Sequence, residues 1–329
     1  MVMSDLPNGR ALAKAYLVEA NDIYAVNQRV CALTAYHDCP DFLFYILNRH
    51  PYFLKFDDGV SQTHLLNQVF LKCQIPVPRN VSEQTAIATA LGDVDALLVA
   101  QDALVAKKRA IKQGAMQGLL TGKRRLPGFN EKWEIKALSD VADVIDPHPS
   151  HRAPREVSHG VPFLGIGDLD EAGNIIGKRL RRVDPSVLAE HATRYNLNDQ
   201  LIGLGRVASI GKVVSLEALA DEIAISPTLG IIRGREAMRS YLLYALRSTF
   251  ITNQFSQIMS GSTRSSVGME VLRKLKVMLP PSGREQTAIA ETLSDMDAEI
   301  TTLDIQRSKT AQLKQGMMQA LLTGRIRLV

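Results

Sequence analysis

The chain has few cysteines and no long hydrophobic stretch. Its three cysteines, Cys31, Cys39 and Cys73, form no Cys-x-x-Cys pair, which excludes a disulfide scaffold and favours a reducing, cytoplasmic setting. No apolar run approaches the ~18–20 residues that span a bilayer, so no membrane partner is expected. The first twenty residues mix Asp5 and Glu19 with apolar positions, a pattern unlike that of a signal peptide.

Catalytic signatures are equally scarce. The chain contains no Gly-x-x-x-x-Gly-Lys phosphate loop, no Gly-x-Ser-x-Gly nucleophile elbow, no deaminase zinc set and no Asn- or Asp-Pro-Pro-aromatic motif of amino-methylating enzymes. Residues 203–208, Gly-Leu-Gly-Arg-Val-Ala, match the loose dinucleotide fingerprint. However, residues 209–214 predict a turn and a strand instead of the helix that such a loop opens. We therefore expect a strand–turn–strand there and no catalytic constellation.

Two groups of metal-ligating residue types lack the spacing of a metal site. His148 and His151 lie three residues apart beside prolines, which prevent a shared helix. Cys31, His37 and Cys39 are close in sequence but lack a fourth ligand at zinc spacing. We expect neither group to bind a metal, and we expect no cofactor on this chain.

The composition is that of a globular protein with a modest positive charge. The chain is 46% hydrophobic and 22% charged, which excludes wholesale disorder. Its 329 residues predict about two domains. The net charge of +5 and the isoelectric point near 9.1 permit a polyanionic partner without requiring one.

The chain contains an internal repeat. Residues 83–126 align without a gap to residues 285–328 at an offset of 202, with 23 identities over 44 positions. The match extends upstream, where the segment starting at Phe42 falls opposite the one starting at Tyr241 at an offset of 199. Each half is a globular segment, a proline-containing hinge and a long polar–apolar stretch, so the simplest interpretation is a duplication whose first copy has a shortened globular part.

Apolar residues in the repeated stretch are spaced alternately four and three apart. They are Ile87, Leu91, Val94, Leu98 and Val105, with Gln101 as a polar break, and Ile289, Leu293, Met296, Ile300 and Leu303. This spacing predicts helices of the coiled-coil kind, about 40 residues and ~60 Å long. We expect the two to pair with each other, and an antiparallel pairing would place the globular segments at opposite ends of one rod.

The ends and the interior of these helices carry further signals. Ser82 with Glu83, and Ser282, are expected caps, and Gly122 and Gly324 stand where helix-ending glycines belong. Three more glycines interrupt the helices at roughly 1 kcal/mol each relative to alanine: Gly114, Gly118 and Gly316. Either another backbone approaches closely there or the helix ends fray, and the sequence does not choose between the two.

The larger globular segment, residues 135–234, has short alternating runs rich in Val, Ile and Gly, which predict strands and turns. Residues 236–260 predict one helix with an apolar stripe that packs into a core. Basic residues gather in its predicted loops and hairpins, where they suit phosphate and base contacts. Taken alone, however, a run of charge is more often only a solvated face. If the segment binds DNA, the contact candidates are Lys178, Arg179, Arg181, Arg182, Arg206, Lys212, Ser262, Thr263 and Arg264.

The repeated unit has a recognisable pattern, Pro-x₄-Glu-Gln-x-x-Ile-Ala…Lys-Gln-Gly-x-Met-Gln-x-Leu-Leu-Thr-Gly, at 78–122 and again at 280–324. It resembles the conserved helical region of specificity subunits of type I restriction–modification systems. Residues 161–169, Ile210-Gly-Lys and Gly261-Ser-Thr are similar to the target recognition domains of that family. The resemblance covers nearly the whole chain, and the duplicated helical unit is its specific part.

The resemblance and the pattern together predict an α+β fold, with mixed α/β target recognition domains joined by two long helices packed as an antiparallel coiled coil. The expected parts are an incomplete first recognition domain at 1–81, a central conserved helix at 82–127, a complete second recognition domain at 128–282 and a distal conserved helix at 283–329.

The resemblance implies a non-catalytic, DNA-binding subunit that reads a bipartite site, with the helices setting the gap between half-sites. It implies docking of methyltransferase subunits and, through them, of a restriction subunit. S-adenosylmethionine, ATP and Mg²⁺ would belong to those partners.

The short first domain departs from the family pattern, because a whole specificity subunit carries two complete recognition domains. Either the coding frame starts further upstream, the gene is broken, or the product pairs with a second specificity chain. A different function also stays open, in which the chain is an assembly scaffold that has lost the reading of one half-site.

Overall fold

The computed structural model describes residues 1–4, 11–20, 23–27, 30–34, 37–57, 65, 67–148, 150, 153–177, 179–219, 222–235, 238–260 and 266–328. They form two compact units. The first unit consists of Met1–Ala106 with Thr301–Val329, and the second is Lys107–Ile300. Each long helix therefore contributes to both units. Within the described residues, no helix is long and apolar enough to cross a membrane.

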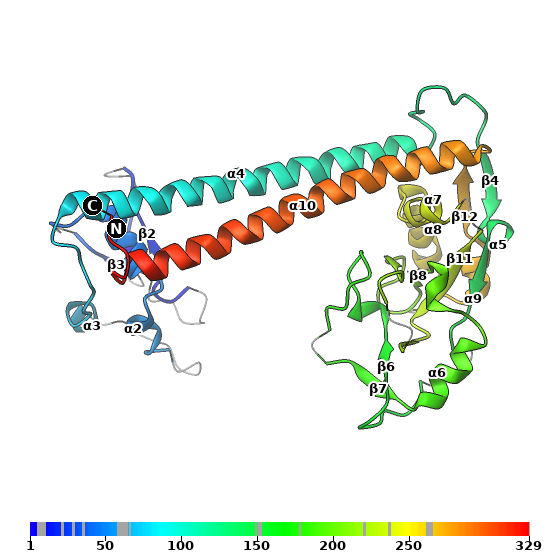
Figure 1. The fold of residues 1–329 in the computed structure, drawn as a ribbon, viewed down its shortest axis with the longest axis horizontal. Helices are drawn as coiled ribbons and strands as arrows, with labels where there is room; N and C mark the ends of the chain where they lie inside the picture. Colours follow the sequence, from blue (N-terminus) through cyan, green and yellow to red (C-terminus); the bar gives the residue numbers. More distant parts are fainter. Residues whose placement is uncertain are drawn as a thin grey trace. The chain divides into compact units, whose positions relative to one another are not determined.

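The first unit has a small antiparallel sheet and short helices beside the beginning of one long helix and the end of the other (Figure 1). The sheet order is β2-β1-β3. The elements are β1 (Val2–Ser4), β2 (Ala15–Tyr16), β3 (Val30–Ala32), α1 (Pro40–Leu47), α2 (Pro51–Leu54) and α3 (Asn67–Leu71). Proline at the first position of α1 suits a helix start. The core of the unit joins Phe42 and Ile46 of α1 to Ile87, Leu91 and Leu321 of the long helices.

The second unit is larger, and its described residues form three sheets. Their orders are β5-β11-β8-β9, β10-β6-β7 and β12-β4. The strands are β4 (Glu134–Ala137), β5 (Ala142–Ile145), β6 (Val161–Leu164), β7 (Arg181–Val183), β8 (Ile202–Gly205), β9 (Val213–Ser215), β10 (Ala224–Ile225), β11 (Leu229–Gly234) and β12 (Lys276–Leu279). The helices are α5 (Leu138–Val141), η1 (Ile166–Asp168), α6 (Pro185–Ala192), η2 (Leu197–Asp199), α7 (Arg239–Leu246), α8 (Thr249–Ser260) and α9 (Met269–Lys274).

The glycine-rich segment 203–208 is a strand followed by a turn, as expected. β8 pairs with β9 antiparallel and with β11 on its other side. A Cβ at Gly203 would lie 2.6 Å from Leu229 and 2.8 Å from Val214, and one at Gly205 would lie 2.1 Å from the Ser209 carbonyl oxygen. Close packing inside the sheet and its turn therefore requires these glycines.

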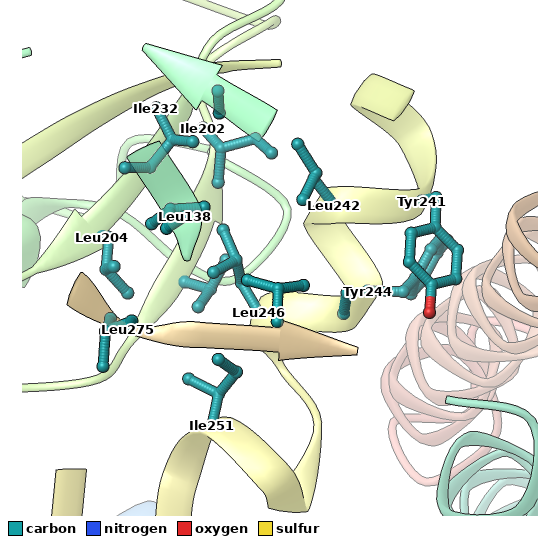
Figure 2. Close-up of a cluster of buried hydrophobic side chains, with 14 of the residues drawn as sticks. Leu138, Ile202, Leu204, Ile232, Tyr241, Leu242, Tyr244, Leu246, Ile251 and Leu275 are labelled. Carbon is teal, nitrogen blue, oxygen red and sulfur yellow. The ribbon is translucent and has the colours of Figure 1, made fainter. Parts of the chain in front are cut away.

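The main core of the second unit lies between the four-stranded sheet and helices α7 and α8 (Figure 2). Leu242 and Leu246 of α7 pack among Ile202, Leu204 and Ile232 of the sheet. Burying a large aliphatic side chain contributes ~1.5–3 kcal/mol, so the apolar stripe predicted within 236–260 is a core face.

That stripe does not lie on one helix, and the prediction of a single helix over 236–260 was wrong in this respect. α7 ends at Leu246, and α8 begins at Thr249. The buried Ser248 accepts backbone hydrogen bonds from Ile251 and Thr252 through its carbonyl oxygen, which starts the second helix. Two short helices can each present an apolar face to the sheet.

The two long helices are α4 (Val81–Leu119) and α10 (Gly283–Leu321). The predicted 4-3 seam is buried or half-buried along both. Gly122 and Gly324 follow the helices with φ of 68° and 74°, so both adopt the left-handed conformation predicted for helix-ending glycines. The expected cap at Ser82 was wrong, because the Asn80 side chain accepts the Ser82 backbone N–H at 3.0 Å and so takes the capping role.

α4 and α10 pack against each other in antiparallel directions, as predicted. In the first unit, Asp95 pairs with Lys314 at 2.5 Å and Asp102 with Arg307 at 2.9 Å. In the second unit, Lys108 pairs with Glu299 at 2.6 Å. Residue numbers rise along α4 as they fall along α10. Gln101, the polar break in the predicted seam, donates to the Thr310 hydroxyl at 3.2 Å, so a hydrogen bond crosses the seam there.

Candidate nucleic-acid interface

The beginning of each long helix carries the same arginine–glutamate ion pair, with the glutamate buried in both units. In the second unit, Arg125 donates two hydrogen bonds to Glu285, at 2.6 and 2.7 Å, and the Glu285 side chain is 1% exposed. In the first unit, Arg327 donates two to Glu83, both at 2.5 Å, and the pKa of that carboxyl lies below its usual range because of this hydrogen bond. The chain following one helix thus binds the beginning of the other in both units.

A second repeated network ties the globular part of each unit to the helices. The Tyr244 hydroxyl donates to Asp297 at 2.9 Å, and Lys112 pairs with the same carboxylate. Burial, followed by the nearby Asp297 charge, raises the pKa of Tyr244 to about 12. Tyr45, Asp95 and Lys314 repeat this arrangement in the first unit.

One hinge contact is repeated as well. Gln84 donates to the Pro78 carbonyl oxygen at 2.9 Å, and Gln286 donates to that of Pro280 at 2.8 Å. All three networks fall at the repeat offsets of 202 and 199 found in the sequence. The Glu-Gln pair and the flanking prolines of the repeated pattern are therefore residues that build the junction between hinge and helix.

The basic residues predicted at 178–182 lie at strand β7, except that Lys178 lies outside the described residues. Arg179 and Arg182 are exposed. Arg181 is half-buried, with its guanidinium 5.8 Å from the ring centre of Phe163, and it donates to the Pro154 carbonyl oxygen. Arg181 therefore supports this surface through its contacts with Phe163 and Pro154.

The segment 153–160 lies along β7 and adds to the same surface. The Val157 backbone N–H donates to the Arg182 carbonyl oxygen at 3.0 Å, and the Arg182 guanidinium donates to the Gly160 carbonyl oxygen at 2.6 Å. We call the exposed basic side chains of the two segments the β7 edge: Arg155, His159, Arg179 and Arg182. Arg155 and His159 were not among the sequence candidates, because only the contacts of Val157 and Gly160 with Arg182 bring their segment beside β7.

Arg206 and Lys212 lie in the turn between β8 and β9, away from β7 in the chain. Arg206 donates to the Val267 carbonyl oxygen at 3.0 Å and approaches Asp146 at 3.5 Å. Lys212 donates to the carbonyl oxygens of Ile166 and Leu169. Arg206 therefore holds Val267, just after residues 261–265, in place. The candidates Ser262, Thr263 and Arg264 lie outside the described residues.

His148 and His191 form a buried pair, and His148 lies just before the segment that leads to the β7 edge. His148 Nδ1 lies 3.1 Å from His191 Nε2, and His191 Nδ1 lies 3.0 Å from the Tyr195 hydroxyl. The Ile225 backbone N–H donates to that hydroxyl at 3.1 Å, so Tyr195 links the histidine pair to β10. Burial lowers the pKa of His191 to about 4.

The sequence associated His148 with His151, whereas the structure pairs it with a residue 43 positions away. His191 lies in the last turn of α6, and Tyr195 follows the helix four residues later, so only this spacing indicates in the sequence that the two side chains are neighbours. The buried pair anchors Asp146–His148 in the fold and leaves the basic residues of the following segment at the surface.

Comparison with known proteins supports a single family. The model of the type I restriction modification DNA specificity domain matches residues 11–105 and 130–315. The type I restriction enzyme MjaVIII specificity subunit of Methanocaldococcus jannaschii is 26% identical over 301 residues, which cover 87% of this chain and 70% of that protein. The putative MjaX specificity subunit of the same organism is 30% identical over 199 residues, covering 59% and 46%.

A solved structure shows the same fold. The type I restriction–modification S subunit from M. genitalium superimposes with a TM-score of 0.55 at 14% identity, covering 86% of this chain and 72% of that one. The family model spans most of this chain, and its two matched regions include the beginning of each long helix, with Glu83 in one and Glu285 in the other. The chain therefore belongs to the family of type I restriction–modification DNA specificity subunits.

Proposed function

We propose that this chain is the non-catalytic subunit that selects the DNA sequence for a type I restriction–modification complex, and that its second unit reads one half of a two-part site. The observation that carries this proposal is the β7 edge, where exposed cationic side chains border a strand in a domain of the specificity family. Such side chains bind phosphate and can reach base edges from a strand.

The proposed DNA contacts divide by environment. Arg179 and Arg182 are exposed and suit direct contact. Lys178, Ser262, Thr263 and Arg264 lie outside the described residues and are proposed as contacts from the sequence alone. Arg181 and Arg206 are half-buried and donate to backbone carbonyl oxygens, so their larger role is to hold the contacting segments in place.

The repeated junctions support docking of two copies of one methyltransferase subunit. Two equivalent surfaces suit two identical partners, because the same contacts can form twice. Crevices of about 460 and 270 Å³ lie at equivalent positions in the two units, between α7 and α10 in one and between α1 and α4 in the other. Their walls include Tyr244 with Thr287 and Tyr45 with Thr85. The restriction subunit would join through these partners, which would hold S-adenosylmethionine, ATP and Mg²⁺.

Selection from a pool of randomised duplexes, with the full chain and its methyltransferase partner, tests sequence reading. We expect enrichment of a defined motif, and uniform weak retention would instead support the scaffold function. The combined Arg179→Gln and Arg182→Gln variant should lower the slope of log affinity against log salt by about 2, since each lost phosphate contact removes ~0.9. Lys132→Gln, an exposed cation before β4, is the matched control and should leave the slope unchanged.

We further propose that the paired helices set the gap between the two half-sites. Inserting seven residues into α4 near Gln101 and seven into α10 near Thr310 keeps the seam in register and lengthens each helix by ~10 Å. At ~3.4 Å per base pair, the selected motif should gain about three base pairs between its halves. An unchanged gap in a folded insertion variant would contradict this role of the helices.

A further inference from the structure

The second unit also contains a basic pocket, and no residue of the β7 edge lines it. Its volume is about 570 Å³, and its walls come from α4, α10, the start of α8 and the segments around 171 and 212. The charged residues that line it are Arg109, Lys112, Lys212, Arg247, Glu171 and Asp297, so four cations face two carboxylates.

Part of this pocket is structural framework. Lys112 pairs with Asp297, and the same carboxylate accepts the Tyr244 hydroxyl. Because Lys314, Asp95 and Tyr45 form the same network in the first unit, this arrangement is common to both halves of the repeat. The Asp297 carboxylate is therefore already bound by Lys112 and by the Tyr244 hydroxyl.

The other cations are specific to the second unit. At the repeat offsets, Arg109 corresponds to Ala311 and Arg247 to Asn48. Arg247 follows α7 and donates to the carbonyl oxygens of Glu171 and Val213, the latter at 3.3 Å. Its Nε–H is buried and has no hydrogen-bond partner among the described residues.

Carbonyl oxygens hold Arg247 and Lys212 in place but do not neutralise them. Lys212 donates to Ile166 at 3.2 Å and also to Leu169. A carbonyl oxygen carries only a partial charge, so the positive potential of both side chains remains in the pocket. A buried guanidinium N–H without a partner is also costly. Both features favour an anion with several acceptor oxygens, and phosphate matches the donor geometry of arginine.

The geometry points to a phosphate-binding pocket for the backbone of double-stranded DNA, in which Arg109, Lys212 and Arg247 hold one phosphodiester group. This inference rests on the proposed function, since it takes DNA as the ligand. The contact is independent of base sequence, because these residues lie on a helix, a turn and a helix end within a pocket, and a phosphodiester carries no base identity. It anchors DNA at the helical pair of the second unit.

The test replaces the second-unit cations by their first-unit equivalents in the full chain. Arg109→Ala and Arg247→Asn are measured singly and together, with Lys107→Ala as the control, since Lys107 is exposed on the same helix. Arg109 is also exposed on α4, where alanine is a good helix former, so this variant keeps the fold. The probe is a randomised duplex pool titrated at several KCl concentrations, and a second arm uses inorganic phosphate alone.

We expect the double variant to lower the salt slope by about 1, the contribution of one phosphodiester group, and each single variant to lower it by part of that amount, with equal weakening on all sequences. A slope for Arg109→Ala equal to that of Lys107→Ala overturns the inference. So does loss of inorganic phosphate binding with an unchanged duplex slope, which would assign the pocket to a free anion. Failure to select a motif would count against sequence reading alone. The salt slope on random duplex would still test the pocket, because that measurement does not need a motif.

Discussion

The two units share their junctions with the long helices and differ in what those junctions hold. Both have the arginine–glutamate pair, the tyrosine–aspartate–lysine network and the glutamine-to-proline hydrogen bond. In the described residues, the first unit has one three-stranded sheet and the second has three sheets. The contacts of the helical junction therefore do not depend on the size of the globular part beside it.

The largest difference is expected at the arginine–glutamate pairs, which are chemically the same but unequally buried. Arg125 is 23% exposed and its partner 1%, whereas Arg327 is 60% exposed. Arg125→Met leaves the buried Glu285 carboxylate uncompensated, which should lower the free energy of unfolding of the second unit by about 3–5 kcal/mol. Arg327→Met should cost the first unit less, because water can reach its pair.

Amide hydrogen exchange, measured separately for amides of each unit, checks this difference. Arg307→Met is the control, because Arg307 and Asp102 form an exposed pair whose loss should change little. Equal losses for Arg125→Met and Arg327→Met would show that burial does not distinguish the two junctions.

The second prediction concerns pH and the histidine pair of the second unit. The folded-state pKa of His191 is about 4, below the 6.5 of an unfolded chain, because burial disfavours its charged form. The unfolded chain therefore takes up the proton first as the pH falls. The stability contributed by neutral His191 is complete above pH ~6.5 and declines until pH ~4, by on the order of 3 kcal/mol in total.

Thermal unfolding between pH 7.5 and 4.5 measures that dependence. His191→Gln should flatten the part of the curve that belongs to the second unit. The matched control is His50→Gln in the first unit, where burial and then Lys55 lower the pKa of a more accessible histidine. If His191→Gln leaves the slope unchanged, another group dominates the acid sensitivity of the second unit.

The smallest effects are expected at Gly114 and its repeat equivalent Gly316. A Cβ at either position would meet no atom of the described residues within 4 Å, so neither glycine serves a close approach within the described part of this chain. Gly114→Ala and Gly316→Ala should each raise the free energy of unfolding by roughly 1 kcal/mol. Gly118→Ala should gain less, since its Cβ would lie 3.1 Å from Arg124.

Chemical denaturation measures the three glycine variants, and binding of the methyltransferase partner measures their function. Weaker partner binding by a stabilised Gly114→Ala or Gly316→Ala variant would indicate that a partner backbone approaches there. Lower stability of both variants would contradict the open environment of these positions.

The long helices were predictable because their signal is local. A seam that alternates steps of four and three, such as Ile87, Leu91 and Val94, repeats on one face of a helix whatever lies elsewhere in the chain. The break between α7 and α8 at Ser248 was not predictable in this way. The apolar stripe continues across it, and both helices pack in the same core as the four-stranded sheet, so the choice between one helix and two depends on that packing.

The candidate interface was only partly predictable. Clustering of arginines at 179–182 was visible in the sequence, but the exposure of Arg182 and the half-burial of Arg181 depend on β6 and on segment 153–160. Arg206 looked like a free cation of a turn, yet it bonds to a carbonyl 61 residues away. The histidine pair likewise joins residues that no local pattern connects.

By itself the sequence determined that the chain is duplicated, that each copy ends in a long amphipathic helix and that the two helices pair, because identity and periodicity are properties of the order of residues. Only the tertiary structure decided which charges are enclosed in junctions, which stand at the surface of β7 and which line the pocket beside α4. The physical reason is that the energy of a charge depends on the burial and the partners around it, and residues as distant as Arg125 and Glu285 become neighbours only when the chain folds.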